Sequence, residues 1–171
     1  MKISTKGRYA LRLMVDLAMN NNGEMVRIKE IAERQHISEK YLEQIISVLK
    51  KVGFVRSLRG SQGGYQLAKK PEEYTVGAIL RLTEGSMAVV SCLEDEENQC
   101  TRANQCVSLK IWTMIDDAVS DVIDHVTLQD MVEWELENVD NIQLTELTAR
   151  GNTPMGSAIS LVSELINDKS I

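Results

Sequence analysis

Aromatic side chains, prolines and long apolar runs are all scarce in this sequence. Phe, Trp and Tyr make up 4% of the 171 residues, whereas hydrophobic residues reach 43%, so the core must be aliphatic. Only two prolines occur, which favours a mostly helical protein. No apolar run approaches the ~18 residues that a membrane span needs, and residues 1–6 lack the apolar stretch of a signal peptide. We therefore expect a soluble, cytoplasmic protein with no membrane partner.

Residue types that build common catalytic sites are equally few. The chain has two histidines, and no Ser/His/acid set is suggested. Its glycine-rich segment, residues 60–64, falls inside a predicted hairpin and not between a strand and a helix, where a phosphate loop would lie. We therefore expect that the protein is not an enzyme. The three cysteines are an odd number in a reducing compartment, which argues against a disulfide scaffold.

The net charge of −6 hides a strong asymmetry along the chain. Residues 1–70 hold 14 Lys and Arg against 6 Asp and Glu, a net charge of +8, whereas residues 71–171 carry −14. A basic first part beside an acidic second part is typical of a protein whose first part faces phosphates. The alternative is a chance bias over solvated surfaces.

The N-terminal pattern predicts three helices followed by a hairpin. The helices are expected from near residue 5 to the Asn20–Gly23 stop, over residues 28–35, and from an N-capping Ser38 to about residue 51. Residues 54–58 and 65–68 alternate like strands around a flexible turn. The fold class is therefore mainly α with a small β-hairpin wing, which is a winged helix-turn-helix.

The C-terminal half predicts a sensor loop and long helices. A helix over residues 76–83, capped by Thr75, precedes an irregular stretch over residues 85–105. The longest helix is expected over residues 107–126, and a further helix, capped by Thr127, through Asn138. Residues 149–154 are interpreted as a linker. The predicted division is 1–84 for DNA binding, 85–106 for the cysteine loop, 107–148 for dimerisation and 149–171 for a flexible tail.

The third helix carries the expected DNA-reading face. A recognition helix presents polar side chains near its N-terminus to base edges in the major groove. The candidates are Ser38, Glu39, Lys40, Tyr41, Glu43 and Gln44, joined by Arg56 and Arg59 from the wing. Arg59 suits a narrow minor groove. In the alternative interpretation Ser38 is only a helix cap and Tyr41 belongs only to the core.

Several segments resemble IscR-type (Rrf-type) transcriptional regulators. They are residues 1–11, 37–38, 41–44, 55–60 and 63–65, and the likeness extends over roughly residues 1–128. The resemblance implies a homodimeric winged-helix repressor or activator. The basic first part and the twofold symmetry of helix-turn-helix dimers predict binding to a palindromic duplex operator. The resemblance also implies that Glu43 tunes base preference on the DNA face.

Three cysteines form a candidate metal-binding motif. Cys92, Cys100 and Cys106 are spaced C-x7-C-x5-C in the loop before the long helix. Thiolates on such a loop can hold an iron–sulfur cluster, bind zinc with a fourth ligand, or form a redox pair with one spare thiol. Unrelated free cysteines are the remaining alternative.

The resemblance implies that these cysteines hold an iron–sulfur cluster, with two or four irons. Relatives often place a histidine three residues after the last cysteine, where this chain has Leu109. Others use an acidic residue of the partner's first helix, where this chain has Arg8, and His36 and His125 match neither position. The fourth ligand could be a small molecule or one of Glu94, Asp95, Glu96, Glu97 and Asn104, so we expect a labile cluster.

Two further expectations concern partners. Some cysteine-metabolism repressors of the same superfamily lack the cysteines and respond to a partner enzyme, so a protein effector is an alternative to the cluster. The long helix is the expected dimer interface, because a twofold pairing would bury the same apolar stripe on both copies. That stripe consists of Leu109, Trp112, Ile115, Val119, Val122 and Ile123.

Overall fold

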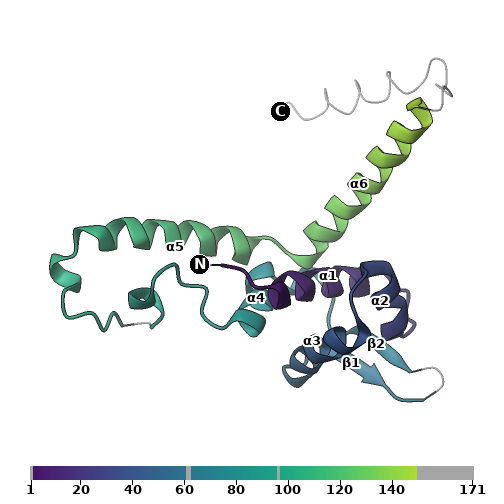
Figure 1. The fold of residues 1–171 in the computed structure, drawn as a ribbon, viewed down its shortest axis with the longest axis horizontal. Helices are drawn as coiled ribbons and strands as arrows, with labels where there is room; N and C mark the ends of the chain where they lie inside the picture. Colours follow the sequence, from purple (N-terminus) through teal and green to yellow (C-terminus); the bar gives the residue numbers. More distant parts are fainter. Residues whose placement is uncertain (1, 61–62, 96, 150–171) are drawn as a thin grey trace. The chain divides into compact units, whose positions relative to one another are not determined.

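The computed structural model describes residues 2–60, 63–95 and 97–149. Within this part the chain forms six α-helices and one antiparallel hairpin, which confirms the expected fold class (Figure 1). The elements are α1 (Thr5–Met19), α2 (Ile28–Gln35), α3 (Glu39–Lys51), β1 (Val55–Leu58), β2 (Gly64–Leu67), α4 (Val76–Glu84), α5 (Val107–His125) and α6 (Leu128–Ala149).

The first three helices fold around one aliphatic core. α1 is capped by Ser4, whose hydroxyl accepts hydrogen bonds from the backbone N–H groups of Lys6 and Gly7 at 3.1 and 3.3 Å. Its apolar side chains pack against those of α2 and α3. Burial of this aliphatic surface is the main driving force for folding of the N-terminal head, which consists of the first three helices and the hairpin. The fully buried side chains of these helices are Leu13, Met14, Leu17, Ile31, Leu42, Ile45, Ile46 and Leu49.

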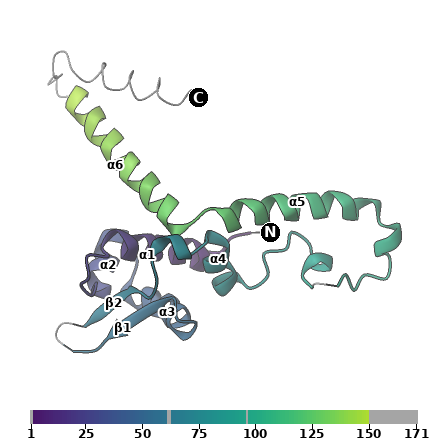
Figure 2. The same cartoon turned by 180° about the vertical axis from the view of Figure 1, so that it is seen from behind.

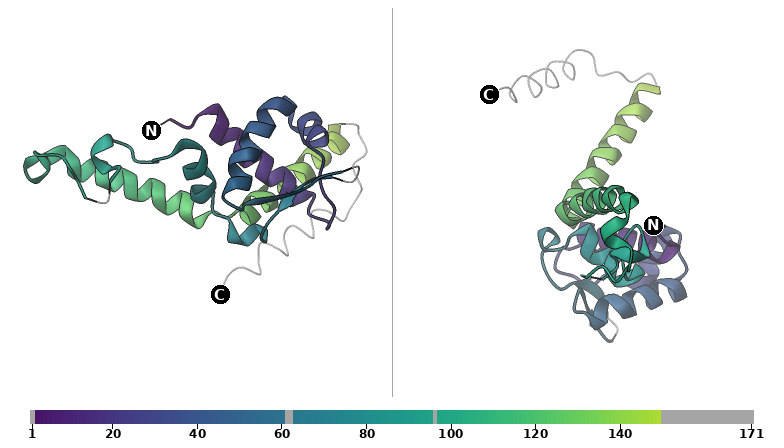
Figure 3. Two further views of the ribbon diagram at one scale, coloured as in Figure 1. Left: turned by 90° about the horizontal axis from the view of Figure 1, so that it is seen from below. Right: turned by 90° about the vertical axis from the view of Figure 1, so that its left-hand side faces the viewer.

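The hairpin is fixed to the helices at its base. Val55 and Leu67 face each other in the register and are both buried, so this end of the ribbon belongs to the core. Val26, just before α2, pairs with Tyr65 across an isolated bridge and holds the other edge of β2. The free end of the hairpin extends from the head beside α2 and α3 (Figure 3). The arrangement is therefore a winged helix-turn-helix.

The cysteine-bearing segment runs out along α5 and turns back at the far end of that helix (Figures 1 and 2). Two short 3-10 turns, Ser91–Leu93 and Ala103–Gln105, are its regular elements. α6 continues to Ala149, beyond the expected end at Asn138, because residues 139–149 contain no glycine or proline to end the helix. The predicted linker after Ala149 and the predicted tail lie outside the described residues.

The chain divides into two compact units, residues 1–133 and 134–171. The first unit holds the winged head, the cysteine loop, α5 and the start of α6. Within residues 2–60, 63–95 and 97–149, no helix is long and apolar enough to span a bilayer.

Candidate nucleic-acid interface and cysteine loop

The recognition-helix candidate α3 is amphipathic. Its inward face is buried in the core, whereas the side chains at its N-terminal end lie at the surface. Ser38 occupies the N-cap position, but its hydroxyl makes no capping hydrogen bond, contrary to the expected capping role. This hydroxyl is exposed and is not committed to the helix. The exposed polar residues on this face are Ser38, Glu39, Lys40, Glu43 and Gln44.

Tyr41 serves as a packing residue at one side of this face. Its half-buried ring meets the ring of Tyr9 edge-on, with centroids 5.8 Å apart, and joins α3 to α1. The Arg12 guanidinium lies over the Tyr9 ring, 5.4 Å from its centroid. Ser38 and Tyr41 also line an open hollow of about 380 Å³ with His36. The ring is therefore placed for packing, and its edge is accessible from the hollow.

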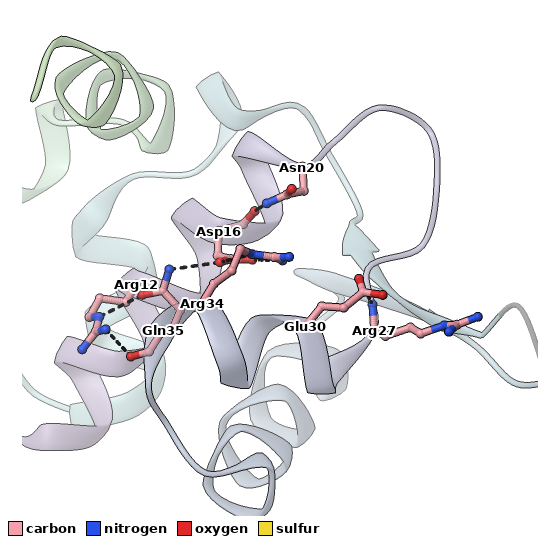
Figure 4. Close-up of polar contacts among 7 residues, drawn as sticks. All are labelled: Arg12, Asp16, Asn20, Arg27, Glu30, Arg34 and Gln35. Atoms are coloured by element: carbon pink, nitrogen blue, oxygen red, sulfur yellow. Dashed lines mark hydrogen bonds and ion pairs between the residues drawn. The ribbon is translucent and has the colours of Figure 1, made fainter. Parts of the chain in front are cut away.

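A carboxylate that the sequence analysis did not single out sets the position of α2. Asp16 is buried in the last turn of α1 and accepts hydrogen bonds from Arg34 Nε at 3.0 Å, Arg34 Nη2 at 2.7 Å and Gln35 Nε2 at 3.0 Å (Figure 4). The hydrogen bond to Asp16 raises the pKa of Arg34 above its usual value. Arg12 binds the side chain and the carbonyl of Gln35.

This network fixes the end of α2 just before the turn into α3. The turn residue His36 has φ 53°, a left-handed conformation that closes α2 in one residue. The sequence held a signal for the network, because Asp16 lies among the apolar residues Met14, Val15 and Leu17, and a buried charge must be paired. Its partners could not be identified, since they lie 18 and 19 residues further along the chain.

The two arginines of the wing, Arg56 and Arg59, have different surroundings. Arg56 donates from Nη2 to the Ala68 carbonyl at 2.9 Å, so its guanidinium is engaged at the base of the hairpin. Arg59 is exposed where β1 leads into the tip. Gly60 has φ +115°, which a side chain would strain, and the Gly63 N–H donates to its carbonyl at 2.9 Å. Residues 61 and 62 of the predicted tip lie outside the described part.

The three cysteines are free thiols on the connection between α4 and α5. Cys92 lies in the first 3-10 turn and is half-buried, whereas Cys100 and Cys106 are exposed. Cys106 is the residue directly before α5, and the Cys100 N–H donates to the side-chain carbonyl of Asn98 at 2.9 Å. Soft thiolate ligands of this kind suit iron–sulfur or zinc centres.

The described side chains do not gather these thiols into one site. In the described ranges, no group of three His, Cys, Asp or Glu residues has an arrangement that could hold a metal ion. Leu109, at the position of the expected histidine, is half-buried. The fourth-ligand candidates Glu94, Asp95, Glu97 and Asn104 are exposed, and Glu96 lies outside the described residues. The three thiols are therefore ligands of the kind that a soft metal centre prefers, but the loop does not bring them together in this structure.

A joint of hydrogen bonds connects this loop and α5 to the head. Arg81 on α4 binds Asp124 on α5 through two contacts, Nη1–Oδ1 at 2.5 Å and Nη2–Oδ2 at 2.8 Å. This ion pair lowers the pKa of Asp124 below its ordinary value. About two turns earlier on α5, the Val89 N–H donates to Asp116 Oδ1 at 3.0 Å and holds the start of the loop.

α5 has no fully buried residue within the chain, although it is rich in apolar side chains. Among the predicted interface residues, Trp112, Ile115 and Val122 are exposed, and Leu109, Val119 and Ile123 are half-buried. The exposed apolar surface includes three residues that the sequence analysis did not assign: Val107, Ile111 and Met114. Exposed apolar surface of this extent is typical of an interaction site.

Comparison with known proteins identifies a family. Residues 3–134 match the Rrf2 model, which is described as "Iron-dependent Transcriptional regulator". The transcriptional regulator CymR of Bacillus subtilis is 42% identical over 134 residues, covering 78% of this chain and 91% of the relative. The regulator IscR of Pectobacterium atrosepticum is 33% identical over 162 residues, covering 94% and 98%. These relatives are named as transcriptional regulators, in agreement with the expectation of a non-enzyme.

Solved structures with the same fold include a CymR and an IscR. The structure of CymR, titled the global cysteine regulator of B. subtilis, has a TM-score of 0.66 at 42% identity and covers 78% of this chain and 98% of that one. The structure of IscR from T. potens has a TM-score of 0.62 at 41% identity and covers 78% and 87%.

Proposed function

Because this chain belongs to the Rrf2 family of helix-turn-helix transcriptional regulators, we propose that it binds a palindromic operator as a homodimer. The observation that carries the proposal is α3, whose inner face is buried while its N-terminal polar side chains are exposed. Those side chains are suited to base edges in the major groove. The proposed DNA-contacting residues are Ser38, Glu39, Lys40, Tyr41, Glu43, Gln44, Arg56 and Arg59.

The charge distribution supports the same surface. The net charge of +8 over residues 1–70 belongs to the segment that forms α1, α2, α3 and the hairpin. A positively charged head attracts the duplex and gives binding that weakens with salt, because bound phosphates release counterions. If the dimer contacts about 6–10 phosphates, its affinity should fall by roughly 10³–10⁵-fold between 50 and 200 mM salt.

Dimerisation is assigned to α5 in this proposal. A helix with several large exposed apolar side chains and no fully buried residue needs a partner surface. A second copy supplies an identical surface, and a twofold pairing would place two heads for the two halves of a palindrome. The functional division is residues 1–84, 85–106, 107–148 and 149–171, for the reading head, cysteine loop, dimerisation helices and tail.

The regulatory part of the proposal assigns an iron–sulfur cluster to Cys92, Cys100 and Cys106. Three thiols on one loop provide the soft donors, and the family description, "Iron-dependent Transcriptional regulator", supports iron as the effector. A bound cluster would supply a group that responds to iron and oxygen. Since Leu109 offers no ligand at the position of the expected histidine, we expect the cluster to be labile.

The residues of this chain provide a route from the loop to the head. Asp116 holds the loop at Val89, and the Arg81–Asp124 pair joins α4 to α5. Ordering the loop would therefore favour one arrangement of α4 against α5. A ligand shifts such an equilibrium only through a difference in its affinity for the two arrangements. The effect on operator affinity should be about 5–150-fold, typical of allosteric coupling.

The deciding experiment is iron and sulfide analysis of protein prepared without oxygen, together with operator binding before and after exposure to air. We expect iron and sulfide in the wild type, their loss in each Cys→Ser variant, and their retention in Ser91→Ala, which changes the exposed neighbour of Cys92. A triple Cys→Ser variant that keeps its iron, with operator affinity unaffected by air, would refute the cluster.

The alternative is a regulator controlled by a protein effector. The 42% identity with CymR, whose structure is titled as that of a cysteine regulator, favours it. In that case, protein prepared without oxygen would contain no iron, and its operator affinity would change only on addition of a partner protein. A zinc or thiol switch would instead give zinc without sulfide, or sensitivity to oxidants without metal.

A further inference from the structure

A basic groove lies between the wing and the helices of the head. It has a volume of about 440 Å³, and its walls come from three elements. Arg27 and Lys29 belong to the start of α2, Lys50 to the last turn of α3, and Arg59 to the wing. All four side chains are exposed, and none of the described residues that line the groove is acidic. A groove walled by cations concentrates anions.

The backbone of the groove also suits an anion. Ile28 and Lys29 are the first two residues of α2, where backbone N–H groups lack intrahelical partners and carry partial positive charge. Figure 4 shows Arg27 at this helix start, next to the strands. On the wing side the lining includes Gly60, Gly63 and Gly64, which allow a close approach because they have no side chains.

Two carboxylates lie beside these groups: Glu30 accepts a hydrogen bond from the Arg27 backbone N–H at 3.4 Å, and Glu33 pairs weakly with Lys29. The Lys29 ammonium lies 4.0 Å from the Glu33 carboxylate, and the two side chains are 73% and 67% exposed. Exposed pairs of this kind contribute little to stability and break readily when a better partner arrives. Lys29 can therefore turn to a phosphate in the groove at small cost.

The geometry of duplex DNA indicates which anion occupies the groove. A recognition helix enters the major groove, while an arginine-bearing arm or wing reaches the adjacent minor groove. One sugar–phosphate strand separates these two grooves, so it must pass between the helix and the wing. The groove lies in that position here, since Lys50 is on α3 and Arg59 is on the wing.

We propose that this groove holds the DNA backbone strand between the major and minor grooves, with Lys29 and Lys50 as phosphate-binding residues beside Arg27 and Arg59. The inference rests on the proposed binding mode of α3 and the wing, and adds the residues that fix their register on the duplex. Phosphate contacts of this kind position the protein and carry no sequence information. Lys29 and Lys50 should therefore strengthen binding to every sequence alike.

The test uses Lys29→Gln and Lys50→Gln, singly and together, in the full chain. Affinity is measured by fluorescence anisotropy across a salt series, on a duplex selected from a random library by the wild type and on a scrambled duplex. In a homodimer each substitution removes one contact from each half-site, so it should flatten the slope of log K against log salt by about 1.8, which is about 0.9 for each lost phosphate contact. Both duplexes should weaken by a similar factor. Lys29→Arg and Lys50→Arg should keep the wild-type slope.

The matched control is Lys110→Gln, which removes one exposed lysine charge from α5, outside the head. It should leave the slope unchanged. An unchanged slope in the double Gln variant, or weakening on the selected duplex alone, would overturn the proposal for the groove. A wild type that binds neither duplex would instead overturn the proposed function and the groove with it, and this failure is visible before any variant is made.

Discussion

Gln44 is exposed on α3 while its neighbours Ile45 and Ile46 are buried, so its side chain can change without disturbing the core. We expect Gln44→Ala to weaken operator binding by about 1–3 kcal/mol, the usual contribution of a specific base contact. Binding to a scrambled duplex should change little, because a base contact contributes there only weakly. The measurement is anisotropy on both duplexes, with urea unfolding as the check on stability. An equal loss on both duplexes, or a matched loss of stability, would assign Gln44 another role.

Glu84 links the end of α4 to the start of α1 and makes stability depend on pH. Its carboxylate accepts from the Ser4 hydroxyl at 2.6 Å, and this hydrogen bond is the main cause that lowers the pKa of Glu84 below its ordinary value of 4.5. A carboxylate with a lowered pKa in the folded state contributes stability above its unfolded pKa and loses it as the pH falls through the folded value.

Glu84→Gln should therefore lower the free energy of unfolding by a constant amount from pH 7 down to about pH 4.5, the ordinary value of the group. The difference from the wild type should then shrink as the pH falls further. Comparing the two proteins by urea unfolding at each pH cancels the other titrating carboxylates. A difference that grows on acidification would contradict the assigned hydrogen bond.

The helices of the head could be predicted from the sequence, whereas the ion pairs that connect the helices could not. The bounds of α2 and α3 follow from apolar spacing and the Ser38 cap position, because helical periodicity is a local property. The Asp16–Arg34 and Arg81–Asp124 pairs join residues 18 and 43 positions apart, and local patterns carry no information about such partners. The grouping of the DNA-face candidates was predictable for α3, whereas the hydrogen bond from Arg56 to the Ala68 carbonyl, 12 residues further along the chain, was not.

The joint between α4 and α5 depends on a glycine. A Cβ added to Gly77 would overlap Asp124 Oδ1 and lie 2.6 Å from Arg81 Nη1. Gly77→Ala should therefore displace the carboxylate and break an ion pair that contributes up to about 1 kcal/mol, since both partners are exposed. That loss offsets the gain of up to about 1 kcal/mol that alanine normally gives over glycine in a helix.

We therefore expect Gly77→Ala to change stability little in the wild type and to increase it in an Asp124→Ala background. A double-mutant cycle by urea unfolding measures this coupling. Equal effects of Gly77→Ala in both backgrounds would show that the Arg81–Asp124 pair does not restrict this position.

The net charge of the whole chain is a poor guide to whether the protein binds DNA. The total of −6 would argue against DNA, yet the head carries +8 and the remainder −14. Local fields decide association, because exposed charges further apart than about 10 Å are largely screened at 0.1 M salt. The acidic remainder also disfavours nonspecific binding through any surface other than the head.

Dimerisation through α5 can be tested directly, because this helix exposes large apolar side chains. Ile111, Ile115 and Val122 are spaced four and seven residues apart, so they share one face of α5, and they are 47%, 38% and 61% exposed. If two copies bury this face against each other, Ile115→Asp places a charge in an apolar interface and should yield monomers in sedimentation. The control Thr113→Asp adds the same charge at an exposed α5 position one-half turn away and should leave the dimer intact. Because a monomer engages only one half of a palindrome, Ile115→Asp should also lose most of its operator affinity while its far-ultraviolet circular dichroism stays unchanged. Dimers that survive Ile111→Asp and Ile115→Asp alike would place the interface on another surface.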